Sequence, residues 1–409
     1  MQLVLRLLVA GLLLVVSSGP ASAQSGPDPS QLDRIADQVG EISGRARLSQ
    51  VDLTFLDQAG LHTYLRETFE RDYLPIERES DQKLLLELGL IQAKDDVVQI
   101  SLDLLSDQVL GVYDPDRKTM FVVSDTPAFG PAAQVTYAHE FEHALQDQYY
   151  GLRRLSSKHP DNYDRAMAVH ALEEGDAVLM EGVWANSHLT PRELAESRRG
   201  GGSNGVLERV PAAIRSELLF PYLDGYRFVA GAYHSAGDSY AAVDELFKNP
   251  PVSTAQVMHP EKYRAGVAPV EVGLAPVLGD GWRTINTNVL GEFETRNVLQ
   301  QYGDRAEASS VASHWAGDRW VLVDKDGSTG LVWKTVWDSP EAAAAFFDTY
   351  GRGLRARFGS ATVDVSDPQR QALSTDDVAT ELRLADTAVL TVIAADRPTA
   401  AALVAGSGP

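Results

Sequence analysis

The chain has 409 residues and no cysteine, which excludes disulfides, thiolate metal ligands and a cysteine nucleophile, so that any metal must bind to histidine and carboxylate side chains. Its formal net charge of −21 argues against nucleic acid as a partner, because phosphate contacts need clustered lysine and arginine. The length exceeds that of one ordinary domain, so two domains are expected.

Residues 1–23 are typical of a secretory signal peptide. Arg6 is the only charged residue, Leu7 to Val16 is apolar, and Ala21-Ser22-Ala23 fits an A-x-A cleavage site. The apolar run is short for a membrane span, although an uncleaved anchor is the alternative interpretation. We expect cleavage near Ala23-Gln24 and no membrane span in the mature chain. An exported chain without disulfides fits secretion or the periplasm and cell envelope of a prokaryote.

The next elements follow from apolar periodicity and turn residues. Residues 24–49 are predicted to be a flexible and partly helical lead, with a helix over 30–41. The first large domain, residues 50–303, is predicted to begin with a strand over 51–55 and helices over 60–73 and 81–91. A pair of strands follows, over 109–113 and 118–123, joined by the turn residues Asp114-Pro115-Asp116.

The segment 133–148 contains neither proline nor glycine and is predicted to be a helix that carries His139-Glu140-Phe141-Glu142-His143. Side chains four residues apart share a helix face, so the two histidines can bind one metal ion. Glu140 can then serve as the general base toward a metal-activated water. The alternative is an ordinary solvated helix face. The small residues Ala138 and Ala144 argue against it, because they place the histidines beside the core.

The third ligand is sought further along the chain. A metzincin needs glycine and histidine at the third and sixth positions after the second histidine, and Gln146 and Tyr149 stand there instead. Glu174, followed by Gly175, is the candidate in a second helix, and Glu173 competes with it.

Two further side chains lie close to these candidates in the sequence. His170 lies four residues before Glu174, on the same helix face, and either borders the metal or packs. Asp147 lies one turn after His143 and could accept its free ring N–H, or be an ordinary exposed aspartate.

The remaining elements predict more helix and then a second, smaller domain. Segment 198–205 is glycine-rich and flexible, and helices are expected over 214–233 and 239–247. Residues 305–409 follow a β-β-α-β-β-α order, with strands over 320–323, 331–337, 378–384 and 388–393, a helix over 339–357 and a last helix after Pro398. Asp324-Lys325-Asp326-Gly327 lacks the later ligands of a calcium loop and is predicted to be a hairpin turn.

His139-Glu140-x-x-His143 together with Glu174-Gly175-Asp176-Ala177 resembles the gluzincin arrangement of zinc metallopeptidases. The wider sequence is similar to a largely uncharacterised group of exported prokaryotic proteins of metallopeptidase type. The motifs that carry this similarity are Tyr113-Asp114-Pro115, His143-Ala144-Leu145-Gln146-Asp147-Gln148, Phe220-Pro221-Tyr222-x-x-Gly225 and Ser253 to Tyr263. The resemblance covers about Val51 to Tyr302 and, weakly, the C-terminal part.

The resemblance implies an α+β fold, with a zincin-like, mostly helical domain and a small edge sheet before the small α+β domain. It also implies one Zn²⁺ ion held by His139, His143 and Glu174, with Glu140 as the base. One departure is Val178, where some gluzincins have an aspartate four residues after the ligand glutamate.

Such peptidases bind substrate as an added strand along a sheet edge beside the zinc. Thr119 to Ser124 is the candidate edge, with a plain structural hairpin as the alternative. A donor to the oxyanion of the tetrahedral intermediate is also expected, and His259 in a proline-punctuated loop is the first choice. Tyr222, Tyr226 and Tyr263 are the alternatives.

The preferred hypothesis is an exported zinc peptidase that acts on a peptide or protein substrate. The alternative is a non-catalytic, metal-stabilised surface or binding protein on the same scaffold, and a third is hydrolysis of a non-peptide amide. The chain contains no G-x-S-x-G elbow, P-loop or dinucleotide fingerprint.

Overall fold

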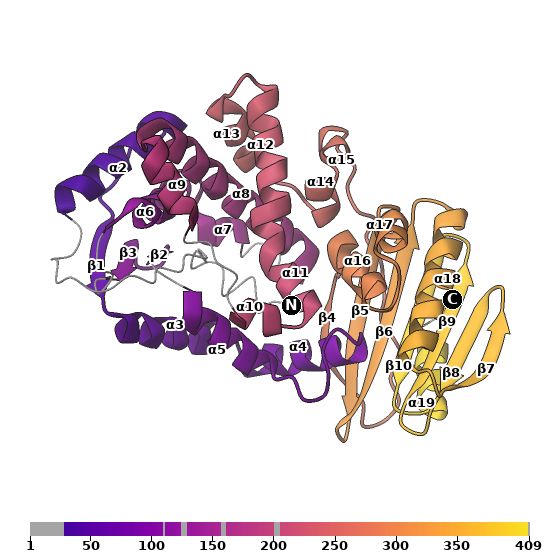
Figure 1. Ribbon diagram of the computed structural model, residues 1–409. Coiled ribbons are helices and arrows are strands. Elements are labelled where there is room, and N and C mark those ends of the chain that lie inside the picture. Colours follow the sequence, from indigo (N-terminus) through magenta and orange to yellow (C-terminus); the bar gives the residue numbers. More distant parts are fainter. Residues whose placement is uncertain (1–27, 109–110, 124–128, 157–160, 200–204, 408–409) are drawn as a thin grey trace.

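The computed structural model describes residues 28–108, 111–123, 129–156, 161–199 and 205–407. The predicted signal peptide therefore lies outside the described residues, as does most of the glycine-rich segment. The fold is α+β, as predicted: a mainly helical N-terminal region with a small sheet is followed by a seven-stranded antiparallel sheet with helices (Figure 1).

The N-terminal region contains helices of very different length and a three-stranded sheet. In chain order these are α2 (Pro29–Ser43), β1 (Asp52–Leu56), α3 (Gln58–Asp72), α4 (Pro75–Glu87), α5 (Val97–Gln108), β2 (Gly111–Asp114), β3 (Thr119–Val123), α6 (Pro131–Tyr150), α7 (Leu152–Ser156), α8 (Tyr163–His188), α9 (Pro191–Arg199), α10 (Gly205–Arg209), α11 (Ala212–Phe220), the π-helical η1 (Pro221–Gly225), α12 (Tyr226–Ser235), α13 (Tyr240–Lys248), α14 (Thr254–Met258) and α15 (Pro260–Arg264).

The C-terminal part is built around the larger sheet. Its elements are β4 (Arg283–Asn288), α16 (Gly291–Tyr302), α17 (Arg305–Ala312), β5 (Trp315–Lys325), β6 (Ser328–Trp337), α18 (Pro340–Arg357), β7 (Thr362–Asp367), β8 (Arg370–Ser374), β9 (Ala379–Ala385), β10 (Ala388–Ala394) and α19 (Arg397–Gly406). The predicted β-β-α-β-β-α order is present, and the hairpin β7–β8 is an addition that the sequence analysis missed.

The larger sheet has the strand order β4-β5-β6-β10-β9-β8-β7, so β4 belongs to it although it precedes residue 305. Alternate residues of β5 face opposite sides: Trp320 and Leu322 join the main core with α18, whereas Val321 and Val323 pack with α19. The turn between β5 and β6 holds Asp326 and Gly327 at φ 51° and 85°. Two residues in this left-handed region are typical of a tight hairpin, which agrees with the predicted turn.

The small sheet has the order β1-β3-β2, with β3 parallel to β1 and antiparallel to β2. The prediction that Thr119 to Ser124 forms the sheet edge is therefore wrong, because β3 is paired on both sides. Ser124 itself lies outside the described residues. The edge strand that contacts α6, the helix of His139 and His143, is β2.

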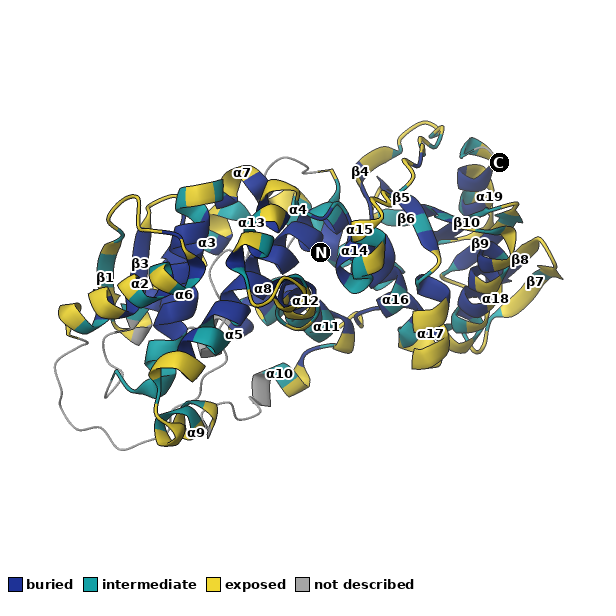
Figure 2. Cartoon of the chain, turned by 90° about the horizontal axis from the view of Figure 1, so that it is seen from above, coloured by how far each residue is buried: buried dark blue, intermediate teal, exposed yellow. Residues whose placement is uncertain are grey.

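The helices α6 and α8 pack against each other in the interior (Figure 2). A main-chain contact between two glycines brings η1 against α8. A Cβ atom built on Gly175 would lie 2.3 Å from the carbonyl oxygen of Gly225, and one on Gly225 would lie 2.1 Å from that of Ala171. Only glycine fits at both positions. The single helix predicted over 214–233 is thus three consecutive elements, with the π-helical turn beside Glu174.

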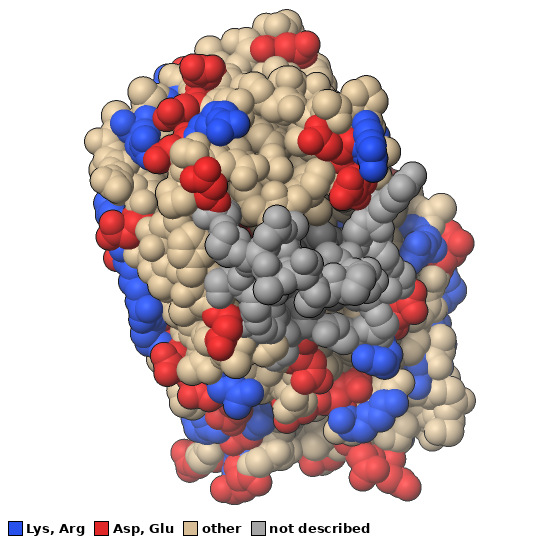
Figure 3. Space-filling view, turned by 60° about the vertical axis from the view of Figure 1, so that its left-hand side comes forward, with Lys and Arg blue, Asp and Glu red and all other residues tan. Residues whose placement is uncertain are grey.

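The two parts of the chain are joined by polar contacts as well as by a common core. Lys83 Nζ lies 2.7 Å from Asp324 Oδ2, and Arg357 Nη2 donates to the carbonyl oxygen of Leu86 at 2.7 Å. On the face shown in Figure 3, lysine and arginine side chains are interspersed with acidic ones. Among the described helices, none combines the length and hydropathy needed to cross a membrane.

Candidate metal centre

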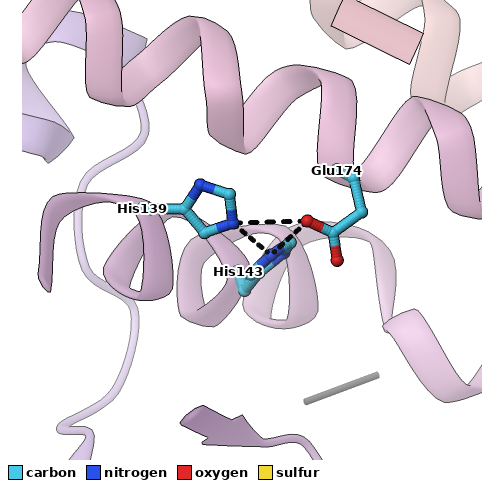
Figure 4. Close-up of side chains that lie close together, drawn as sticks. All are labelled: His139, His143 and Glu174. Carbon is cyan, nitrogen blue, oxygen red and sulfur yellow. Dashed lines mark hydrogen bonds and ion pairs between the residues drawn. The ribbon is translucent and has the colours of Figure 1, made fainter. Parts of the chain in front are cut away.

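Two helices bring three ligand atoms together in the interior. His139 and His143 lie one turn apart on α6, and Glu174 reaches them from α8 (Figure 4). The two Nε2 atoms are 3.2 Å apart, and Glu174 Oε2 lies 3.3 Å from that of His139 and 3.5 Å from that of His143. All three side chains are buried. The structure thus places together the three residues predicted as metal ligands.

The other ring nitrogens are engaged by oxygen atoms. Nδ1 of His139 lies 3.1 Å from Glu181 Oε2, and Nδ1 of His143 lies 2.9 Å from Gln146 Oε1. Because an amide or carboxylate oxygen accepts, the proton of a neutral ring belongs on Nδ1 in this arrangement, which leaves the Nε2 lone pair for a metal ion at the shared point.

Of the two roles considered for Asp147, that of the partner of His143 is taken by Gln146. Asp147 instead accepts hydrogen bonds from the Tyr113 hydroxyl at 3.0 Å and from the Leu152 N–H at 3.1 Å.

These three atoms fit one tetrahedral metal ion. Bonds of about 2.0–2.2 Å to nitrogen and oxygen separate the ligand atoms of a tetrahedral zinc by about 3.3–3.5 Å. The observed separations of 3.2, 3.3 and 3.5 Å match these edges. Both carboxylate oxygens of Glu174 are buried and accept no hydrogen bond from the described residues. Such a cluster of nitrogen and carboxylate atoms could hold one metal ion.

The pKa values in the centre shift in the direction that a cation site requires. Burial by itself lowers the pKa of His139, but the contacts with Glu174 and Glu181 outweigh it and raise this pKa to about 10. Burial likewise opposes ionisation of Glu174, yet the neighbouring histidines hold its pKa below the ordinary value. The site therefore favours positive charge, for which a proton and a metal ion compete.

Glu140 lies beside the three ligand atoms without being one of them. Its Oε2 accepts a hydrogen bond from the main-chain N–H of Tyr113 on β2 at 3.0 Å. Its Oε1 is buried and has no hydrogen-bond partner in the described structure. Burial raises the pKa of this carboxyl group. One oxygen is thus fixed by the sheet edge, and the other remains available for a proton.

The competing ligand Glu173 stands outside the triad. Its Oε2 lies 3.7 Å from Nδ1 of His170, and its carbonyl oxygen accepts from Gln146 Nε2. His170 borders the centre, since its Nε2 lies 3.9 Å from Glu174 Oε1.

The candidates for the oxyanion donor lie in different surroundings. His259 Nε2 lies 2.6 Å from Glu292 Oε1, and none of its described contacts involves the three ligands. Tyr263 donates to the carbonyl oxygen of Asn249. Tyr222 on η1 stacks over His139, with ring centroids 6.5 Å apart and an interplanar angle of 22°. Of these candidates, Tyr222 is the one in ring contact with a ligand.

Two partners of the ligands were not predicted from the sequence, although their spacing is compatible with contact. Gln146 lies three residues after His143, and Glu181 lies two helical turns after Glu174, so each shares a helix face with a ligand. Glu181 thereby fills the orienting role that the departure at Val178 left open.

Comparison with known proteins adds one finding. Residues 279–405 match a family described as a domain of unknown function, DUF8575. This match covers the seven-stranded sheet and its helices and leaves the metal centre outside. No curated protein and no solved structure matches the chain.

Proposed function

We propose that this protein is an exported zinc-dependent peptidase that hydrolyses peptide bonds in a peptide or protein substrate. One observation carries the proposal: three buried ligand atoms converge at tetrahedral spacing, and a fourth buried group, Glu140, lies beside them with one oxygen available. Three protein ligands with a remaining position are typical of catalytic zinc sites, whereas structural zinc sites have four.

Each residue then has a defined task. Zinc, when bound, supplies a Lewis acid that polarises the substrate carbonyl and lowers the pKa of water. Glu140 accepts the proton of the attacking water on Oε1 and passes it to the leaving amine. The N–H of Tyr113 holds Oε2, so that Glu140 keeps its orientation during both transfers.

The substrate backbone is proposed to lie along β2, because this edge strand reaches the base. Glu140 contacts the strand through Tyr113, and a Cβ atom on Gly111 would lie 3.9 Å from Glu140 Cγ. Because Glu140 engages the N–H of Tyr113, a peptide at this edge would pair with other main-chain groups of β2 and bring its carbonyl next to the ligands.

Tyr222 is proposed as the group that stabilises the oxyanion, in place of His259. We expect Tyr222→Phe to lower kcat by about 10²-fold or more, the usual effect of removing one oxyanion donor, with little change in zinc content. Steady-state kinetics and metal analysis test this. Tyr302→Phe, the same change on an exposed side chain whose hydroxyl donates to the carbonyl oxygen of Gly89, is the matched control. A normal kcat for Tyr222→Phe together with a low kcat for His259→Ala would return the role to His259.

The proposed function is tested on the purified full chain by metal analysis and a broad peptide library. We expect one zinc ion per chain and cleavage that a chelator abolishes and added zinc restores. Bound zinc without cleavage of any peptide would favour the non-catalytic binding protein. A chain that binds no zinc would overturn the metal centre itself.

A further inference from the structure

Arg45 is a buried cation that contacts α6 and α8, the two helices that carry the proposed metal ligands. The helix α2 ends at Ser43, and the next residue, Gly44, has φ 71° and turns the chain so that Arg45 enters the interior. Its side chain is 1 % exposed. The helix α2 itself packs on α6 and α8, the two helices that carry the ligands. A segment predicted to be a lead before the first domain is therefore part of the interior around the metal centre.

Three acidic groups surround this guanidinium. Nη1 donates to Asp176 Oδ2 at 2.9 Å and to Glu142, and Nε donates to Asp244 Oδ1 at 3.0 Å. The aromatic rings of Tyr150, Tyr240 and Phe247 lie 5.3–5.7 Å from its central carbon. Burial lowers the pKa of Arg45, but the acidic partners outweigh burial and keep the side chain charged.

A chain of hydrogen bonds leads from this cluster to a metal ligand. Asp176 Oδ2, which accepts from Arg45, also accepts from Gln146 Nε2 at 3.1 Å. The same Nε2 donates to the carbonyl oxygen of Glu173 at 2.9 Å. The other end of the Gln146 amide, Oε1, faces Nδ1 of His143 at 2.9 Å.

The direction of the Gln146 amide decides whether His143 can bind a metal. With Oε1 toward the ring, Nδ1 must carry the proton and Nε2 keeps its lone pair. If the amide were reversed, its NH₂ group would face Nδ1, and the proton of neutral His143 would move to Nε2, where it blocks coordination. Two acceptors, Asp176 Oδ2 and the Glu173 carbonyl, hold the NH₂ group away from the ring.

We infer that Arg45 is a positioning residue for the metal centre: it holds Asp176 in place, and Asp176 sets the direction of the Gln146 amide and hence the tautomer of His143. This inference rests on the proposed zinc site. It goes beyond that site because it assigns a role in metal binding to the segment that follows α2. The partner of the other histidine, Glu181, is 23 % exposed and has no described contact with Arg45, so it orients His139 independently.

The test measures zinc affinity by chelator competition and the absorption spectrum of the cobalt-substituted full chain. We expect Arg45→Lys to weaken zinc binding by about 10–100-fold, the usual effect of losing an outer partner of a ligand, and to alter the cobalt spectrum. Gln146→Met should cause a similar loss. Because both act through one chain of contacts, the double variant should lose little more than either single variant.

Glu181→Gln is the matched control, since its effect should add to that of Arg45→Lys. If the wild-type protein binds no zinc, the proposed function itself is refuted, and the inference about Arg45 fails with it. A folded Arg45→Lys protein with wild-type zinc affinity and spectrum would overturn the inference, as would full additivity with Gln146→Met.

If Arg45→Lys does not fold, Asp176→Asn provides the second variant, because Arg45 then keeps Glu142 and Asp244 as partners. An asparagine can present its NH₂ group to Gln146, and the Glu173 carbonyl is then the one acceptor left of the two that hold the Gln146 amide in its direction. We expect the same 10–100-fold loss, and unchanged zinc affinity in folded Asp176→Asn would overturn the inference.

Discussion

Glu140→Gln is expected to abolish peptide hydrolysis while the protein keeps its zinc. Glutamine retains the size of the side chain and an oxygen that can accept from the N–H of Tyr113, but it cannot take a proton from water. Loss of a positioned base lowers the rate by about 10²–10⁴-fold. The measurement is kcat on a peptide that the wild type cleaves, together with the zinc content of both proteins.

The control for this variant is Glu245→Gln, which makes the same chemical change on an exposed side chain that pairs with Lys248. It should leave both kcat and zinc content unchanged. Activity of Glu140→Gln at the wild-type level would refute the assignment of Glu140 as the base. Loss of zinc in the variant would instead show that Glu140 supports the metal.

Glu174→Ala is expected to leave the purified chain with substoichiometric zinc. The substitution removes the only anionic ligand of the triad and leaves two neutral imidazoles whose lone pairs face each other. The loss of affinity should exceed the roughly 10–100-fold that follows from removing an outer partner. Mass-spectrometric metal analysis and chelator competition measure it.

The neighbouring carboxylate supplies the matched control. Glu173→Ala removes a buried glutamate whose side chain contacts His170 and lies outside the triad. It should keep one zinc per chain. Stoichiometric zinc in Glu174→Ala, or its loss in Glu173→Ala alone, would mean that the ligand is the other glutamate.

The three ligands could be predicted because their spacing carries local information. His139 and His143 are one helical turn apart, and Glu174 is followed by a glycine that permits close approach of another backbone. The choice between Gln146 and Asp147 as the partner of His143 could not be made in this way. Both lie within a turn of the histidine, and the hydroxyl of Tyr113, from a distant strand, is what engages Asp147.

Contacts between distant segments explain two of the other differences between prediction and structure, and an exposed strand explains a third. The parallel alignment of β1 with β3 joins segments far apart in the chain, and it alone moves Thr119 to Val123 from the edge to the middle of the sheet. The hairpin β7–β8 was missed because β7 is largely exposed and lacks the alternation of a half-buried strand. Arg45 carries no local signal, since its partners Glu142, Asp176 and Asp244 come from three distant helices.

The contact between Gly175 and Gly225 has a consequence for which positions near η1 can be substituted. There the main chain of α8 contacts the main chain of η1. Gly175 follows the ligand Glu174 on α8, and Gly225 lies three residues after Tyr222 on η1. The separation of the two helices is thereby independent of which side chains line η1. Leu223 and Tyr226 are exposed, and neither side chain takes part in this main-chain contact. Substitutions at these two exposed positions are therefore expected to leave the spacing between η1 and α8 unchanged.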